Sequence, residues 1–194
     1  MRVHGDKVLR RRLGINELND YRDAKDILLA DFQNLCGYCG KNSCIMHERF
    51  HIDHFVPVKI ASDKKNDYNN LVLSCPKCNL IKSSKWPTKD KNIAHDEYNG
   101  FIDPATEEYD QHIERDKDGY IQGKTVLGKN MCKNLNFHIR RTDLYWKIHH
   151  LYQIQEELEC LYDEKKLDEV EKDFYIESNK LLKQYLNEAF AKGE

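Results

Sequence analysis

Apolar residues recur at helical spacing near the N-terminus and again over the last part of the chain. Between Asn16 and Phe32 they stand three or four positions apart, which predicts one helix with Asn16 as its N-cap. From Asp143 to Ala191 the same spacing continues, with a break near Asp163. Two antiparallel helices fit this second stretch best, with its aromatic side chains filling a core.

Strand patterns lie between these helical stretches. The apolar run Leu71–Leu73 predicts a buried strand, and Glu48–Ile52 predicts a second short strand. A short helix is expected from Asn79 onward. Between His95 and Gly128, turn dipeptides separate short apolar segments, which predicts a loop with a small hairpin. The hairpin strands are assigned to two segments, Tyr120–Ile121 and Thr125–Leu127.

This mixture of helices and short strands indicates an α+β fold in a mainly helical chain. The chain has 194 residues, which suits one small domain with an extension. We expect the N-terminal helix and the strand-bearing unit to occupy residues 1–92. Residues 93–194 would then hold the loop, the hairpin and a C-terminal helical extension.

Charge is distributed unevenly along the chain, although the formal net charge is only −2. Residues 59–91 contain eight Lys and three Asp, whereas residues 95–118 contain nine acids and two bases. Residues 151–194 contain twelve acids and six bases. A locally basic segment can bind a polyanion even when the whole chain is acidic. The alternative is that the acidic flanks simply solvate helices.

Membrane segments and export signals are not evident in the sequence. No apolar run approaches the roughly 18 residues that a membrane-spanning helix needs. The N-terminal residues also lack the apolar core of a secretory signal. We therefore expect a cytoplasmic protein without a membrane partner.

Two Cys-x-x-Cys pairs provide the strongest chemical signal. Cys36 and Cys39 form one pair, and Cys75 and Cys78 form the other. Each turn lets two sulfurs face one cation, so two turns complete a tetrahedral, structural Zn²⁺ site. The alternative is two disulfides, which a cytosolic location disfavours. The three other cysteines are expected to be small buried residues: Cys44, Cys132 and Cys160.

An acid and an imidazole stand side by side between the two cysteine pairs. Asp53 and His54 follow the predicted strand and precede Pro57. Successive residues of a strand point to opposite faces, so both can reach one site only if the strand ends or bulges there. A carboxylate can bind a hard cation, and an imidazole can accept a proton from water near neutral pH. Alone, such a pair is more typical of a surface.

The segment from Cys36 to Lys85 resembles the HNH endonuclease motif, the ββα-metal nuclease fold in its zinc-stapled form. It contains Cys-x-x-Cys, then Asp-His-Phe-Val-Pro, then Asn-Leu, and finally Cys-x-x-Cys-Asn with a Lys three residues on. Asn79 stands where the second His of the motif often occurs, so this is an HNN variant. The Gly-Gly often found after the Pro is absent, and residues 61–68 stand in its place.

The resemblance implies a role for each matching residue. His54 would be the general base, and Asn70 would hold the loop that carries the base. Asp53 and Asn79 would bind a catalytic Mg²⁺ or Mn²⁺. Weaker candidates for contact with nucleic acid are His51, Lys82 and Lys85. The alternative for His51 is a packed or solvated side chain, and for the two lysines it is a solvated helix face.

The function implied by this resemblance is metal-dependent hydrolysis of phosphodiester bonds in nucleic acid, with DNA favoured and RNA as the alternative. Three dipeptides after the motif also resemble bacterial antiphage HNH proteins such as the nuclease subunit of the Septu system, which pairs with an ATPase. They are Asp103-Pro104, Asp118-Gly119 and Leu135-Asn136. An ATPase subunit or a second copy of the chain is therefore an expected protein partner. The alternatives are a non-catalytic zinc module that binds nucleic acid and an interaction protein with a vestigial nuclease unit.

Overall fold

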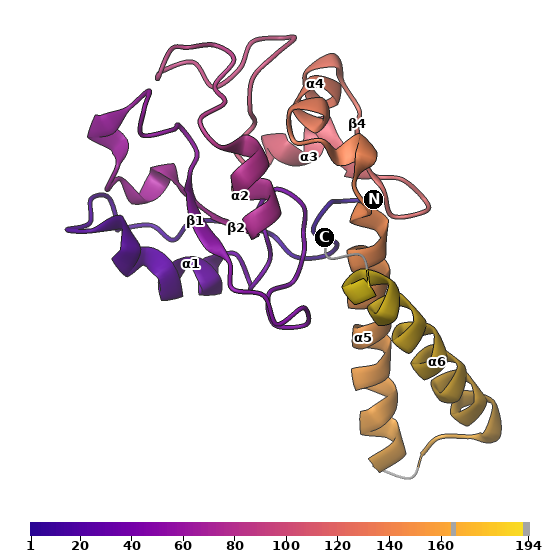
Figure 1. The fold of residues 1–194 in the computed structure, drawn as a ribbon. Coiled ribbons are helices and arrows are strands. Elements are labelled where there is room, and N and C mark those ends of the chain that lie inside the picture. The colour runs from indigo at the N-terminus through magenta and orange to yellow at the C-terminus, as the bar shows by residue number, and fades with distance from the viewer. Residues whose placement is uncertain (164–165, 192–194) are drawn as a thin grey trace. The chain divides into compact units, whose positions relative to one another are not determined.

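The computed structural model describes residues 1–163 and 166–191. These residues form helices and two small antiparallel sheets, so the expected α+β class is confirmed (Figure 1). The chain divides into two compact units, Met1–Thr142 and Asp143–Glu194. The first unit contains residues 93–142 together with the segments that precede them.

The first unit contains short helices and four short strands. In chain order its helices are η1 (Tyr21–Ala24), α1 (Lys25–Asp31), η2 (Ser62–Lys64), η3 (Tyr68–Asn70), α2 (Pro76–Lys82), α3 (Glu108–His112), α4 (Val126–Asn134) and η4 (Phe137–Ile139). Its strands are β1 (His51–His54), β2 (Leu71–Ser74), β3 (Ile113–Arg115) and β4 (Ile121–Gly123).

Strands β1 and β2 form the antiparallel hairpin on which helix α2 packs. Their register pairs His51 with Ser74 and His54 with Leu71. All four residues of β2 are buried, as its apolar sequence predicts. Strand β1 begins three residues later than the predicted strand and ends at His54, close to Pro57. Helix α2 follows β2 directly, so the second cysteine pair lies at the start of this helix.

The N-terminal helix starts later than its apolar spacing predicts. Asp20 is the N-cap, and its carboxylate accepts a hydrogen bond from the backbone N–H of Arg22. Before this point the chain pairs with the loop that precedes β2, where Leu18 N donates to Asn66 O at 2.9 Å. The prediction of a helix from Asn16 was therefore wrong at its start, because these residues find backbone partners outside a helix.

The second hairpin is also displaced from its prediction. It joins β3 to β4, with Arg115 opposite Ile121. Thr125 is not in a strand: its hydroxyl accepts from Gly128 N at 3.1 Å and caps helix α4. A Cβ on Gly128 would lie 2.0 Å from His112 O, so the close crossing of α4 over the end of α3 requires glycine.

One buried cation ties distant parts of the first unit together. Arg115 is only 1% exposed, and its guanidinium donates to four backbone carbonyl groups. They belong to Val3 (3.0 Å), Cys39 (2.6 Å), Gly119 (2.6 Å) and Thr142 (3.0 Å). This network joins the N-terminal residues and the Cys36–Cys39 turn to the segment from Arg115 to Thr142 within the first unit.

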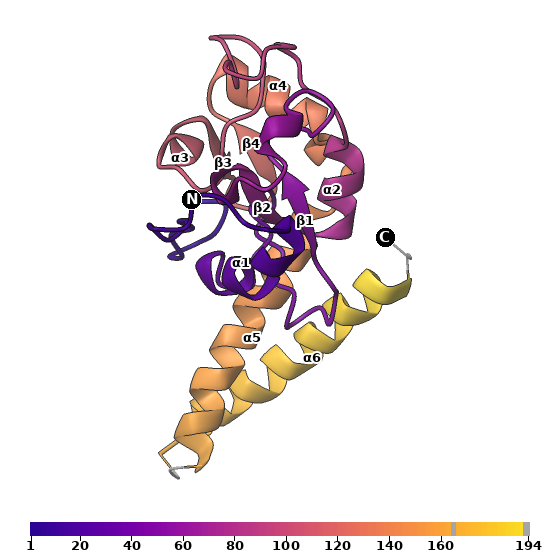
Figure 2. The same cartoon turned by 90° about the vertical axis from the view of Figure 1, so that its left-hand side faces the viewer.

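The second unit consists of helices α5 (Thr142–Asp163) and α6 (Glu169–Ala191). The predicted break near Asp163 is confirmed. The order of contacts shows that the helices are antiparallel, as predicted and as Figure 2 shows. Lys147 lies 6.0 Å from the Tyr185 ring, and the Tyr162 and Tyr175 rings stack at 6.5 Å.

Within the described part of the chain, no helix combines the length and the apolar character that crossing a membrane requires.

Candidate metal centre and active site

The four cysteines of the two pairs converge at one buried point. The sulfur atoms of Cys36, Cys39, Cys75 and Cys78 all lie within 4.8 Å of one another. A Zn–S bond of about 2.3 Å in a tetrahedron implies sulfur atoms about 3.8 Å apart. The Cys39 and Cys75 sulfurs are 3.8 Å apart, and none of the seven cysteines forms a disulfide. The geometry therefore fits zinc and not the disulfide alternative.

Burial gives a further reason to place a cation in this cluster. Burial raises the pKa of the Cys36 and Cys78 thiols, which means that their thiolates are unfavourable without a nearby positive charge. Helix α2 begins at the cluster, and Cys78 N lies 3.4 Å from Cys75 Sγ. Arg140, which is not part of the four-cysteine cluster, places a positive charge beside it, with Nη1 3.2 Å from Cys78 Sγ.

The other three cysteines do not join the cluster. Cys132 is buried, as expected of a small apolar side chain. Cys44 and Cys160 are exposed, so the prediction that they are buried was wrong. Cys160 stands on α5, whose two-helix unit has too few neighbouring elements to cover every side.

Asp53 points inward from β1 and contacts two buried groups. The Tyr38 hydroxyl donates to Asp53 Oδ2 at 2.6 Å, and Lys82 Nζ lies 3.0 Å from the same oxygen. Oδ1 takes part in neither contact. Burial raises the pKa of Asp53, and the positive charge of Lys82 opposes that shift. The carboxylate is thus held in one orientation, with one oxygen engaged.

Lys82 differs from the surface lysine that the sequence analysis expected. Its side chain is fully buried, and its ammonium group also donates to His54 O at 2.8 Å. Burial lowers the pKa of Lys82, and Asp53 opposes that change. In this position Lys82 fixes β1 to α2 and cannot reach a phosphate outside the protein. Lys85 is exposed, and its ammonium donates to Asn134 O at 2.8 Å.

His54 points to the other side of β1 from Asp53. Its Nε2 lies 2.8 Å from Lys65 O, and its ring meets the Tyr21 ring edge-on at 4.8 Å. A carbonyl oxygen only accepts hydrogen bonds, so Nε2 carries the proton and Nδ1 keeps the lone pair. Strand β1 ends at His54, so the strand end that was expected near Asp53 comes directly after His54.

Asn70 joins the end of β1 to the start of β2. Its side-chain oxygen accepts from Val56 N at 2.8 Å, and its amide donates to Val56 O at 3.0 Å and Lys64 O at 3.2 Å. Its backbone oxygen accepts from Phe55 N at 2.7 Å. The loop that carries Lys65, the partner of His54, is therefore fixed by one buried amide.

His51 and Asn79 meet on the exposed side of the same strand–helix frame. Asn79 Nδ2 lies 3.2 Å from His51 Nδ1. His51 and Asp53 stand two residues apart on β1. Their respective contacts, Asn79 and Lys82, stand three residues apart on α2. The strand and the helix thus present two paired contacts, one exposed and polar, one buried and ionic.

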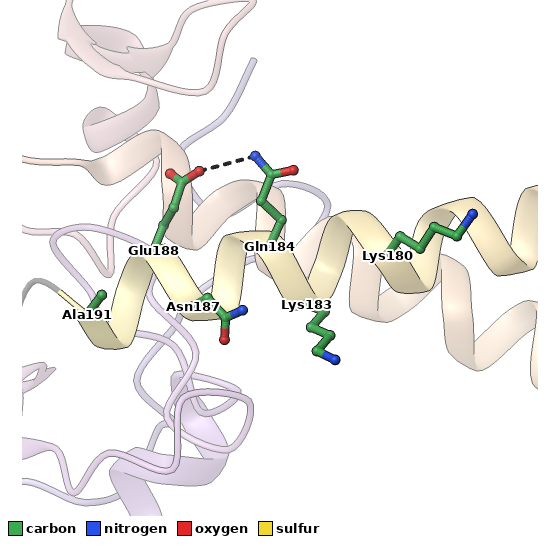
Figure 3. Close-up of a pocket in the computed structure, with 6 residues that line it drawn as sticks. All are labelled: Lys180, Lys183, Gln184, Asn187, Glu188 and Ala191. Carbon is green, nitrogen blue, oxygen red and sulfur yellow. Dashed lines mark hydrogen bonds between the residues drawn. The ribbon is translucent and has the colours of Figure 1, made fainter.

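A hollow of about 460 Å³ opens at the exposed pair. Residues from η1, α1, the segment before β1, β1 itself and α2 line it, including Tyr21, Lys25, Arg49, His51 and Asn79. A different hollow, on α6, is lined by that helix alone, through the six residues labelled in Figure 3: Lys180, Lys183, Gln184, Asn187, Glu188 and Ala191. A single helix cannot enclose a ligand, so only the first hollow belongs to the candidate site.

Sequence reasoning missed the residues from other segments that support the Cys36–Cys39 turn. Each binds a backbone oxygen of this turn: His4 contacts Gly37 O at 2.7 Å, Tyr109 donates to Tyr38 O at 2.6 Å, and Arg115 donates to Cys39 O. Tyr38 was also missed. Its place inside Cys-Gly-Tyr-Cys was the available signal, because the zinc turn fixes its backbone.

Comparison with known proteins agrees with the geometry. Residues 36–85 match the family model described as HNH endonuclease. No curated protein and no solved structure matches the chain. This segment is therefore similar to HNH endonuclease domains, a family whose members are generally nucleases, and it carries a four-cysteine cluster that suggests zinc.

Proposed function

We propose that the chain is a metal-dependent endonuclease that hydrolyses phosphodiester bonds of nucleic acid, with DNA preferred over RNA. One observation supports this above the others: the matched domain keeps Asp53, His54 and Asn79 on one rigid β1–α2 frame. The cysteine cluster anchors the same helix at its first turn. A module that only bound zinc would not need these three residues together.

In this proposal His54 is the general base. Its Nε2–H is held by Lys65 O, which leaves Nδ1 to accept a proton from the attacking water. Imidazole suits that task near neutral pH. Asn70 is a positioning residue, because it fixes both ends of the loop that carries Lys65.

Asp53 and Asn79 would hold a single Mg²⁺ or Mn²⁺. Both residues offer hard oxygen donors, and Asp53 Oδ1 is outside the contacts with Tyr38 and Lys82. When bound, such an ion stabilises negative charge on the phosphate and on the departing oxygen. Tyr38 and Lys82 keep the carboxylate aligned, and His51 orients the Asn79 amide.

The test is cleavage of labelled DNA and RNA by the wild type, by His54→Ala and by a control, His138→Ala. His138 is an exposed histidine of η4. Each protein is assayed with Mg²⁺, with Mn²⁺ and with EDTA, and circular dichroism verifies that the fold survives. Loss of a positioned base typically costs about 10²–10⁴-fold in rate. Cleavage that is equal in EDTA, or unchanged in His54→Ala, would contradict the mechanism.

One observation favours the non-catalytic alternative. Lys82 already pairs with Asp53, so the carboxylate brings less net negative charge to a divalent cation. A protein that folds, binds nucleic acid and cuts neither DNA nor RNA in any metal would be a binding module with a vestigial nuclease unit. The same cleavage assay therefore separates the two functions.

We also propose an effector role in bacterial antiphage defence, in the cytoplasm, with an ATPase subunit as partner. The support is the resemblance of the segments after the motif, together with apolar side chains that stay exposed on α6, such as Val170 and Phe174. The test is co-purification of His54→Ala with the products of neighbouring genes, beside a phage-plaque assay of the wild type. Light scattering tests self-association. Absence of both protection and a co-purified subunit would reject this role.

A further inference from the structure

Cationic side chains surround the hollow beside His51 and Asn79. Arg22, Lys25 and Arg49 all line it. Arg22 and Arg49 are exposed, while Lys25 is half-buried, with its ammonium donating to Phe50 O. The hollow therefore combines a concave shape with a concentration of positive charge, which the segment before residue 36 supplies in large part.

The positive charges are close enough to affect one another. Burial and then the charge of Arg49 lower the pKa of Lys25, while Asp26 acts in the opposite direction. Arg22 itself pairs with Asp20 at 3.1 Å. An anion placed between Arg49 and Lys25 would relieve their mutual repulsion.

Tyr21 links this hollow to the candidate base. It lines the hollow and also packs edge-on against the His54 ring. The Lys65 ammonium lies 5.9 Å from the Tyr21 ring centre, and the Arg22 guanidinium lies 5.8 Å from it. Two positively charged side chains, Arg22 and Lys65, therefore lie near the Tyr21 ring, which contacts both the hollow and His54.

We propose that this hollow binds the sugar–phosphate backbone of the nucleic-acid substrate, with Arg22, Lys25 and Arg49 against phosphates next to the one that is cut. The inference rests on the proposed function and names the surface that holds the substrate. Tyr21, Arg22 and Lys25 all precede the matched domain at residues 36–85. The HNH domain by itself therefore supplies only part of the substrate site, and η1 with α1 completes it.

The experiment measures binding separately from cutting. Arg22→Gln and Arg49→Gln are combined in the His54→Ala protein, and fluorescence anisotropy follows binding of labelled duplex DNA, single-stranded DNA and RNA at several salt concentrations. The matched control combines Lys7→Gln with Lys117→Gln, two exposed cations that do not line the hollow. Both double variants remove the same charge.

Each contact with a duplex phosphate contributes about 0.9 to the slope of log K against log salt. Loss of two contacts should therefore lower the slope by about 2 in the hollow variant and weaken duplex binding at least about tenfold at low salt. The control should keep the slope of its parent. Equal binding by parent and hollow variant would overturn the inference, as would an equal loss in the control.

The two proposals can fail independently. If the wild type cuts, the hollow variant binds normally, and Arg22→Gln with Arg49→Gln in the wild-type background leaves cleavage unchanged, the substrate surface lies elsewhere and the nuclease function stands. If the wild type cuts nothing in any metal while the hollow variant still loses binding and salt slope, the hollow is supported and the nuclease function fails.

Discussion

The two units of this protein are built in opposite ways. In the first unit, buried apolar side chains form one cluster that also encloses charged groups, among them Arg115, Lys82 and Asp53. In the second unit two helices pair, and large apolar residues such as Val170 and Phe174 stay more than half exposed. The difference indicates that the first unit needs one exact arrangement, whereas the second tolerates change on most of its surface.

The cysteines should give the largest contrast between the units. Cys78→Ser removes one sulfur of the cluster and should yield an unfolded or insoluble protein, because binding of structural zinc contributes directly to folding free energy. Cys160→Ser, at an exposed position on α5, should leave expression, zinc content and melting temperature unchanged. Metal analysis and thermal unfolding measure both. A Cys78→Ser protein that folds without metal would show that the cluster is dispensable.

Ion pairs should show the same contrast at lower magnitude. Lys82→Met leaves Asp53 buried without its counter-charge, and breaking a buried pair in this way costs about 3–5 kcal/mol. Lys180→Met breaks the pair with Glu177 on α6, where both side chains are exposed, and should change stability little. Urea unfolding compares the two. A double variant, Lys82→Met with Asp53→Asn, should recover part of the loss, and no recovery would mean that the charge was not the cause.

A histidine in the first unit should make its stability depend on pH. Burial lowers the pKa of His4 to about 4 from its ordinary value of 6.5. Between pH 6.5 and 4 the unfolded chain therefore binds a proton at His4 that the folded chain does not bind. The contribution of neutral His4 to the free energy of unfolding is fully present above pH 6.5 and falls as pH drops toward 4. Over that window the loss is about 3 kcal/mol.

The measurement is the urea midpoint of the wild type and of His4→Gln across this range, with exposed His150→Gln on α5 as the control. Protonation of the zinc ligands destabilises all three proteins, so the difference between their pH profiles isolates His4. A His4→Gln profile parallel to that of the wild type would show that His4 contributes nothing.

The smallest effect is expected on the exposed side of α6. Phe174 is 53% exposed, so Phe174→Ser should change the free energy of unfolding by less than about 0.5 kcal/mol. Urea unfolding at low protein concentration gives this value for the isolated chain. Light scattering of the same variant shows whether it also changes self-association. A loss above 2 kcal/mol would mean that the second unit is as exactly packed as the first.

The sequence alone predicts some of these features well. Local spacing placed the Cys36–Cys39 and Cys75–Cys78 turns, the buried strand at Leu71 and the pair of C-terminal helices, because each depends on neighbours in the chain. The extent of the first unit does not follow from local spacing, since the contacts that hold it together join residues far apart in sequence, such as Val3, Arg115 and Thr142. Tertiary contacts cannot be inferred from periodicity.

The same limit applies within the candidate site. The motif identified Asp53, His54 and Lys82, but only the structure shows that Lys82 is buried against Asp53 while His54 faces Lys65. The alternation of a strand predicts that neighbouring side chains diverge, yet it does not say which one enters the core. The choice depends on Tyr38 and α2, which pack against one side of β1.

The guanidinium of Arg115 also has a consequence for synthesis. It joins Val3 and Cys39 to Thr142, so the contacts that complete the first unit cannot form until residue 142 has left the ribosome. We expect ribosome-bound chains ending before Arg115 to stay sensitive to protease, and released chains ending after Thr142 to resist it. Equal resistance in both would show that residues 36–85 mature on their own. With this arrangement, a partly made chain would not present a finished candidate site.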